Sequence, residues 1–253
     1  MPQISIKITK ILLSLFGIIF IISSFSVSAA EEQPALSIKQ KAEINQMIRD
    51  YILDHPEILP EAIQILQNRT KTAMLKRHHT RLYNDGFSYV GGNKNGDVTI
   101  IEFFDYNCGY CKTALDTMEK LIKADKNLRV IYKEFPILSE SSYVMSKAAM
   151  ASMKQGKYPE FHAALMKSTG KMTENRIFKI ARDLGIDEQI LAKDMTSPVL
   201  ERNIQINHGL AKALQITGTP GFIIGDTVIP GAVPYEELVK AIERTRRASQ
   251  KAK

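Results

Sequence analysis

The chain has 253 residues, two cysteines and a formal net charge of +7. This charge is mild for the length, and no arginine-rich block with interleaved aromatic residues precedes the last dozen residues, which argues against nucleic-acid binding. A fold that depended on disulfides would spread more cysteines along the chain, so we expect one medium-sized domain with an appendage rather than a disulfide scaffold.

Residues 1–30 have the pattern of an export signal. Two lysines precede an almost wholly apolar run at residues 11–22, and the small residues Ser28 and Ala30 stand where a cleavage site is expected. An uncleaved membrane anchor is the alternative, but the run is shorter than the ~20 residues that a spanning helix needs. We therefore expect a cleaved signal peptide and export to an oxidising compartment such as the periplasm.

Residues 31–86 predict an N-terminal helical segment with an unstructured start. Apolar residues recur twice at helical spacing, and a stretch with two prolines at residues 54–60 separates the two helices. Two helices with narrow apolar stripes cannot form a core alone, so they pack either on the main domain or on another subunit. We favour a homo-oligomer through residues 38–80, because these helices lie outside the fold that follows. The stripes consist of Ile44, Met47, Ile48, Tyr51 and Ile52, and of Ile63, Leu66, Thr70 and Ala73.

From residue 87 the pattern becomes that of an α/β domain. Residues 87–90 predict an edge strand, and residues 98–104, apolar at nearly every position, predict a central strand covered on both faces. A helix is expected from the cysteine pair to about Ala124, followed by a second strand over residues 128–135.

The second half of the chain is predicted to be helical before it returns to strands. Residues 222–224 and 227–229 indicate a hairpin across Gly225-Asp226, whose glycine suits a type II′ turn, and residues 235–246 indicate a closing helix. The expected organisation is an α/β domain of residues 87–138 and 217–246, an inserted helical domain of residues 139–216, and a basic, solvated tail of residues 247–253.

Cys108 and Cys111 enclose Gly109-Tyr110 at the start of the predicted helix. Residues three apart on a helix share a face, so the two sulfurs can meet as a redox-active disulfide, Cys108–Cys111. Unpaired N–H groups and the helix dipole favour a thiolate at Cys108, the expected nucleophile. Cys111 lies one turn inside, less exposed, and is expected to resolve the mixed disulfide.

Three other roles compete for the cysteine pair: a zinc site, a structural disulfide and copper(I) binding. A zinc site needs two more ligands, and the histidines are scattered. A structural disulfide across so small a loop adds little stability. Copper(I) binding by the soft thiolate pair stays open as an alternative function. Met145, Met150 and Met153 could assist copper, but their place within an amphipathic helix favours core packing, so we expect no resident metal.

Pro220, in the sequence Gly218-Thr-Pro-Gly221, directly precedes a predicted strand. Proline removes a ladder donor there, and a cis Thr219–Pro220 bond would turn the chain and leave the backbone of Thr219 free to pair with an extended substrate. An ordinary trans turn explains this stretch by itself, but with the cysteine pair upstream we favour the cis bond.

Glu102 stands in the apolar strand six residues before Cys108. A buried carboxylate is costly unless it is paired or protonated. Glu102 is therefore either a proton acceptor for Cys111 or a charge paired with a lysine such as Lys133. Asp105 and Glu134 raise the same question less sharply.

Three motifs in this order resemble the DsbA-like branch of the thioredoxin superfamily: Ile101 to Lys112, Tyr132 to Pro136 and Gly218 to Phe222. The resemblance runs from about Phe87 to Arg246. It implies an α/β thioredoxin fold with an inserted helical domain. It also implies the roles of nucleophile for Cys108, its partner for Cys111, cis-proline for Pro220 and buried acid for Glu102.

The helices before Phe87 resemble the N-terminal oligomerisation segments of copper-suppressor and DsbA2-type members. Two departures concern the site: the best-known oxidases carry Pro-His where this chain has Gly109-Tyr110, and valine where it has Thr219. Both look like the choices of periplasmic disulfide isomerases, and loss of the histidine cation implies a weaker oxidant.

These observations predict an exported thiol:disulfide oxidoreductase. We expect it to form, isomerise or reduce disulfides in other exported proteins that bear cysteines. A membrane redox partner would reset the cysteine pair, and no bound cofactor is required.

Overall fold

The computed structural model describes residues 36–251, so the predicted export signal lies outside the described residues. The chain divides into two compact units, Met1–Pro56 and Glu57–Lys253. Within the described part, no helix combines the length and the apolar character needed to cross a membrane.

The described part of the first unit is the predicted helix, α1 (Ile38–Asp54). It begins with a capping box: Ser37 Oγ accepts from the backbone N–H of Gln40 at 3.2 Å, and the Gln40 side chain accepts from Ser37 N at 2.9 Å. No residue of α1 is buried. Its apolar stripe is therefore open, with Met47 62% and Ile48 52% exposed.

The second unit begins with α2 (Ile58–Arg77) and α3 (His79–Tyr83). Pro60 lies in the first turn of α2, where a missing N–H costs no helical hydrogen bond. α2 buries only Leu75, near its end, and α3 buries Leu82. The predicted second helix is confirmed, and most of its apolar stripe is exposed.

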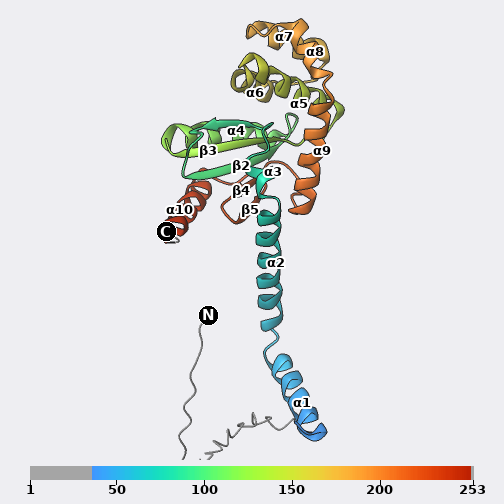
Figure 1. Ribbon diagram of the computed structural model, residues 1–253, viewed down its shortest axis with the longest axis vertical. Coiled ribbons are helices and arrows are strands. Elements are labelled where there is room, and N and C mark those ends of the chain that lie inside the picture. Colours follow the sequence, from blue (N-terminus) through green and yellow to red (C-terminus); the bar gives the residue numbers. More distant parts are fainter. Residues whose placement is uncertain (1–35, 252–253) are drawn as a thin grey trace, which may run out of the picture. The chain divides into compact units, whose positions relative to one another are not determined.

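A five-stranded mixed sheet forms the centre of the second unit, in the order β1-β3-β2-β4-β5 (Figure 1). β2 is central, pairing parallel with β3 and antiparallel with β4. Its apolar run is buried on both faces, as predicted. β1 is an edge strand that begins two residues later than expected. The strands are β1 (Tyr89–Gly92), β2 (Val98–Phe104), β3 (Leu128–Glu134), β4 (Gly221–Ile224) and β5 (Thr227–Pro230).

α4 (Gly109–Ala124) makes the crossover from β2 to β3, as a parallel pair requires. It packs with α10 (Tyr235–Lys251) on one face of the sheet, in the core that includes Ile100 and Phe104. The opposite face is covered by residues of α2, α3 and the end of α9. Between β4 and β5, Gly225 has a φ of +60°, as the predicted type II′ turn needs.

α10 continues beyond Arg246, where the sequence pattern ended it. Arg246 forms ion pairs with Asp97 at 2.7 Å and Asp125 at 2.8 Å, which hold this part of the helix against the domain. Residues 247–251 therefore extend the helix instead of forming a separate tail, and all five are exposed.

The chain between β3 and β4 is helical, as predicted. Figure 1 shows these helices gathered beyond one side of the sheet, with α9 running back toward it. Met145 and Met150 are buried within α5, which confirms core packing for them. The elements are α5 (Glu140–Ser152), the 3-10 turn Met153–Gln155, α6 (Tyr158–Lys167), α7 (Glu174–Asp183), α8 (Glu188–Met195) and α9 (Pro198–Ala213).

Candidate active site

The two cysteines lie at the start of α4, where β2 has just ended. Cys108 is the N-cap of the helix, with extended backbone at φ −78° and ψ 115°, and its sulfur accepts from the backbone N–H of Cys111 at 3.3 Å. Both thiols are free in this structure. Cys108 is 6% exposed and Cys111 is fully buried, so the predicted asymmetry between the outer and inner thiol is present.

The loop before β4 lies against the outer thiol. The Thr219–Pro220 peptide bond is cis, as expected. Cys108 Sγ donates to the carbonyl oxygen of Thr219 at 3.2 Å. Pro220 is buried and Thr219 half-buried. The fold therefore brings together the two motifs that the sequence singled out.

The residues between the cysteines point away from the core. Tyr110 is 71% exposed. No heavy atom lies within 4 Å of the position that a Cβ would take at Gly109. Gly109-Tyr110 therefore forms the solvent-facing rim of the cysteine pair.

Glu102 is buried in β2, with 3% of its surface exposed, and does not pair with Lys133. In the parallel β2–β3 pair, Glu102 lies beside Tyr132 and Phe103 lies beside Lys133. Because alternate residues of a strand point to opposite faces, Glu102 and Lys133 point away from each other. The ion-pair alternative for Glu102 is therefore wrong.

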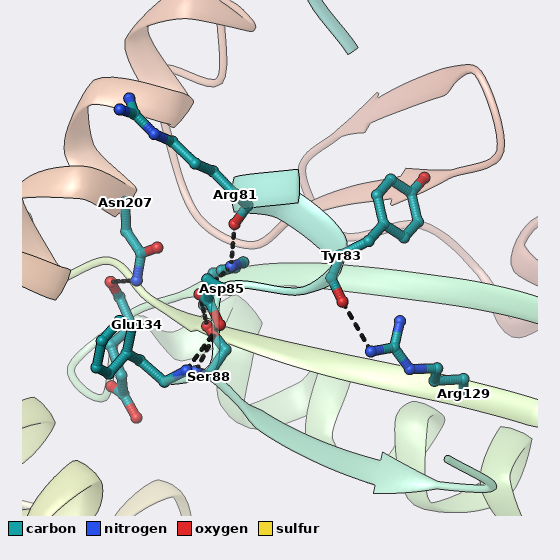
Figure 2. A network of polar contacts seen from close by, with 9 residues as sticks. Arg81, Tyr83, Asp85, Ser88, Arg129, Glu134 and Asn207 are labelled. Atoms are coloured by element: carbon teal, nitrogen blue, oxygen red, sulfur yellow. Dashed lines mark hydrogen bonds and ion pairs between the residues drawn. The ribbon is translucent and has the colours of Figure 1, made fainter. Parts of the chain in front are cut away.

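The actual partner of Lys133 is Asp85, 2.5 Å away, in the segment that follows α3. The backbone carbonyl of Arg81 also accepts from the Lys133 ammonium at 2.8 Å. Figure 2 shows Arg81, Asp85 and Ser88, which belong to this network. Asp85 in turn accepts from Ser88 Oγ at 2.7 Å. The Lys133 side chain has no exposed surface, so this network holds residues 81–88 against the face of the sheet opposite Glu102.

Burial raises the pKa of the Glu102 carboxyl to about 8, and the nearby Glu134 carboxyl adds to the shift. Burial also raises the pKa of the Cys111 thiol well above its usual range, with the charge of Glu102 contributing in the same direction. Glu102 lies on the same face of the sheet as Ile100 and Phe104, which is the face covered by α4, the helix that carries Cys111.

A second buried acid, Glu134, lies in a polar cluster at the end of β3. Glu134 Oε1 accepts from the hydroxyls of Tyr106 at 3.1 Å and Tyr158 at 2.8 Å. Tyr106 also contacts His162 Nδ1 at 3.0 Å. Burial lowers the pKa of His162 to about 3, so its ring is neutral.

Asp105, just after β2, connects the cysteine loop to the helical insertion. Its side chain accepts from the backbone N–H groups of Asn107 at 2.7 Å and Ile137 at 2.8 Å and from Ser142 Oγ at 2.7 Å. Its carbonyl accepts from Cys108 N at 3.1 Å. This role depends on packing between distant segments, and only the burial of an acid in an apolar run hinted at it.

In the part of the chain that the structure describes, no three or more His, Cys, Asp or Glu side chains lie together in a group that could hold a metal ion.

The parallel β2–α4–β3 unit, the cysteine pair at the start of α4 and the cis-proline beside it define a thioredoxin-like fold of the thiol–disulfide oxidoreductase class. A family model described as a DSBA-like thioredoxin domain matches residues 99–243, and one described as the copper resistance protein ScsC N-terminal domain matches residues 40–73. The chain belongs to the DsbA-like thioredoxin domain family, with an ScsC-type N-terminal domain.

Solved structures agree with this assignment. A thioredoxin-like oxidoreductase from Silicibacter pomeroyi DSS-3 is 43% identical, with a TM-score of 0.65, and the match covers 66% of this chain and 97% of that one. A linker-deleted mutant of Proteus mirabilis ScsC is 30% identical, with a TM-score of 0.70, over 86% of this chain and 99% of that one. The thiol-disulfide exchange protein alpha-DsbA2 of Wolbachia pipientis is 26% identical, with a TM-score of 0.67, over 71% of this chain and 97% of that one.

One curated relative is much longer than this chain. The Na(+)/H(+) antiporter NhaA 1 of Salinispora arenicola strain CNS-205 is 24% identical over 156 residues. The match covers 61% of this chain and 24% of the antiporter, so it carries no inference about transport.

Proposed function

We propose that the protein is exported to the periplasm, where it exchanges disulfides with the cysteines of other exported proteins through Cys108 and Cys111. The observation that carries this proposal is the pair of free thiols at a helix N-terminus, the outer one 6% exposed and the inner one fully buried, beside a cis-proline loop. A thiolate is the form of cysteine that attacks a disulfide and leaves it most readily.

In the oxidising direction, a substrate thiolate attacks Cys108 of the Cys108–Cys111 disulfide. A mixed disulfide forms at Cys108, and Cys111 leaves as a thiolate that takes a proton from Glu102. The second thiol of the substrate, as a thiolate, then attacks the substrate sulfur of the mixed disulfide. Cys108 leaves as a thiolate, and the substrate departs with a disulfide of its own. The backbone of Thr219 would pair with the extended substrate strand.

In the reducing or isomerising direction, the reduced Cys108 attacks an incorrect disulfide, and Cys111 releases the enzyme if the mixed disulfide persists. Thr219 and the Gly109-Tyr110 pair, which resemble the choices of disulfide isomerases, favour this direction. A cycle that oxidises or reduces a substrate changes the redox state of the cysteine pair. A membrane redox partner must then reset the pair.

The deciding experiment measures insulin reduction and the equilibrium of the Cys108–Cys111 couple with glutathione. The resting redox state is trapped by alkylation in the native compartment. A mainly reduced pair is expected for an isomerase or reductase, and a mainly oxidised pair for a disulfide donor. The Cys108→Ser variant should fold and lose turnover, because serine is a good N-cap residue but a poor nucleophile here.

Full activity of Cys108→Ser would refute the assignment of the nucleophile. Copper(I) binding is the competing outcome of the same study. Tight stoichiometric binding of copper(I) by wild type, together with no insulin reduction, would replace the proposed activity with metal binding.

We also propose that residues 38–80 assemble the chain into a homo-oligomer. The support is the apolar surface left open: Met47, Ile48 and Tyr51 on α1, and Ile63 and Leu66 on α2, are all more than half exposed. Oligomerisation would remove this surface from water. Active sites paired in one assembly would suit isomerisation, since two sites can hold a misfolded chain between them.

A further inference from the structure

Two buried carboxyls lie on the same face of the catalytic sheet. Glu102 lies beside Tyr132 and Phe104 lies beside Glu134 in the β2–β3 register, so Glu134 is the diagonal neighbour of Glu102 on that face. Each is 3% exposed. Two acids this close in a dry interior do not ionise independently, because the first charge raises the cost of the second.

The hydrogen bonds around the two acids are unequal. The hydroxyls of Tyr106 and Tyr158 both donate to Glu134 Oε1 and so stabilise its carboxylate. Among the described residues, no hydroxyl donates in this way to Glu102. Glu134 is therefore the member of the pair that gives up its proton first.

Within residues 36–251, no cation forms an ion pair with Glu134 to offset the charge that it then carries. Lys133, its chain neighbour, points to the other face and pairs with Asp85. The nearby His162 ring is neutral. The titratable and polar groups around Glu134 are Glu102 on β2, Asp105 and Tyr106 after β2, Tyr89 on β1, Tyr132 on β3, Ser146 on α5, Tyr158 and His162 on α6, and Asn203 and Asn207 on α9.

We propose that Glu134 is a positioning residue for the thiol–disulfide reaction, whose carboxylate, held by Tyr106 and Tyr158, keeps the remaining proton on Glu102 beside Cys111. This inference rests on the proposed function, since it concerns the proton that Cys111 receives there. It assigns Glu134 no contact with substrate and makes it act through Glu102.

The proton of Glu102 is transferred in one step of the exchange, the departure of Cys111 from the disulfide. When a thiolate attacks Cys108, the new sulfur–sulfur bond forms as the Cys108–Cys111 bond breaks, and the electron pair leaves on Cys111. Cys111 takes the proton of Glu102, which becomes a carboxylate. The attacking thiol is oxidised to the mixed disulfide and Cys111 is reduced. A protonated Glu102 therefore assists Cys111 as a leaving group, because the buried thiolate is strongly disfavoured.

The test compares wild type with Glu134→Gln, which removes the charge but retains shape and a hydrogen-bond acceptor. With ¹³C-labelled glutamate, NMR gives the titration midpoint of the Glu102 carboxyl, assigned with Glu102→Gln. The midpoint is expected to fall by about one pH unit in Glu134→Gln, since a neighbouring charge shifts a buried carboxyl by this order. The rate at which dithiothreitol reduces the disulfide, corrected for thiolate concentration, should begin to fall at a correspondingly lower pH in Glu134→Gln than in wild type.

Glu160→Gln is the matched control, because Glu160 is an exposed acid on α6, the helix that carries Tyr158. It should leave the Glu102 midpoint unchanged. Tyr158→Phe is a milder second variant that removes one hydroxyl from the Glu134 carboxylate, and it should raise the pH of the first carboxyl ionisation. If Glu134→Gln does not fold, the shift of the first carboxyl ionisation in Tyr158→Phe decides the test.

An unchanged Glu102 midpoint in Glu134→Gln, or an unchanged first ionisation in Tyr158→Phe, would overturn the inference. The proposed function fails by a different result, a wild-type disulfide that does not exchange with thiols or reduce insulin. The NMR comparison separates the two, since it measures the coupling of the acids without turnover.

Discussion

The Cys108 thiol donates to the carbonyl oxygen of Thr219 at 3.2 Å, across 111 residues of sequence. The contact joins the start of α4 to the loop before β4. It places a backbone segment capable of strand pairing directly beside the outer sulfur. A peptide that extends along this loop would bring its own sulfur to Cys108.

The first prediction concerns the inner thiol. Cys111→Ser should retain the fold and accumulate mixed disulfides at Cys108, because the escape reaction needs the second sulfur. Non-reducing gel electrophoresis and mass spectrometry of the protein recovered from its native compartment would detect them. Cys108→Ser is the control and should form none. Equal yields from both variants would contradict the assignment of the two roles.

The second prediction is that Glu102→Gln reduces the pH dependence of stability. The folded pKa of Glu102 is about 8 against a usual value of 4.5, so between these values the folded state binds more protons than the unfolded state. The free energy of unfolding therefore falls as pH rises through this window. From pH 5 to pH 8, the variant should lose less stability than wild type, by about 1 kcal/mol or more.

Urea unfolding at a series of pH values measures this effect. Some dependence should remain in the variant, because burial raises the pKa of Glu134 to about 8 as well. Identical slopes for Glu102→Gln and wild type would show that Glu102 has no raised pKa in the folded protein.

The third prediction concerns the pair that holds residues 81–88 against the sheet. Asp85→Asn leaves the buried Lys133 ammonium without its counter-charge and should destabilise the domain by about 3 kcal/mol. Lys133→Met should cost less, since it removes the buried charge and Asp85 retains its hydrogen bonds to Phe87 N, Ser88 N and Ser88 Oγ. Chemical denaturation of both variants tests this order, and a larger loss for Lys133→Met would contradict it.

The fourth prediction tests assembly through α1. Ile48→Glu places a charge in the open apolar stripe and should lower the mass measured by light scattering, because burying that charge in an interface is costly. Gln46→Glu adds the same charge on the opposite side of the helix and should leave the mass unchanged. The same mass for Ile48→Glu and wild type would show that this stripe does not hold subunits together.

Local patterns were sufficient to predict much of the fold. The apolar run at residues 98–104 predicts a central strand, and the cysteine pair predicts the helix that starts at Gly109. These features follow from burial and from the N-terminal end of a helix, which neighbouring residues define. The DsbA-like resemblance then supplied the order in which the elements combine.

The surroundings of the buried acids could not be predicted in this way. The face to which Glu102 points relative to Lys133 depends on the β2–β3 register, which a single strand pattern does not define. From the helical insertion, Tyr158 reaches Glu134 and His162 reaches Tyr106, and no local signal in α6 indicates these contacts. Such clusters arise from tertiary packing between distant segments.

Gly109 and Tyr110 point outward, so their identity affects the chemistry of the cysteine pair but not the packing of the core. Because neither contributes a side chain to the core, substitutions there alter the reactivity of the sulfurs and the surface met by a partner at little cost to folding. Variation at this dipeptide can therefore change the reactivity of the two sulfurs while the packing that supports them stays the same.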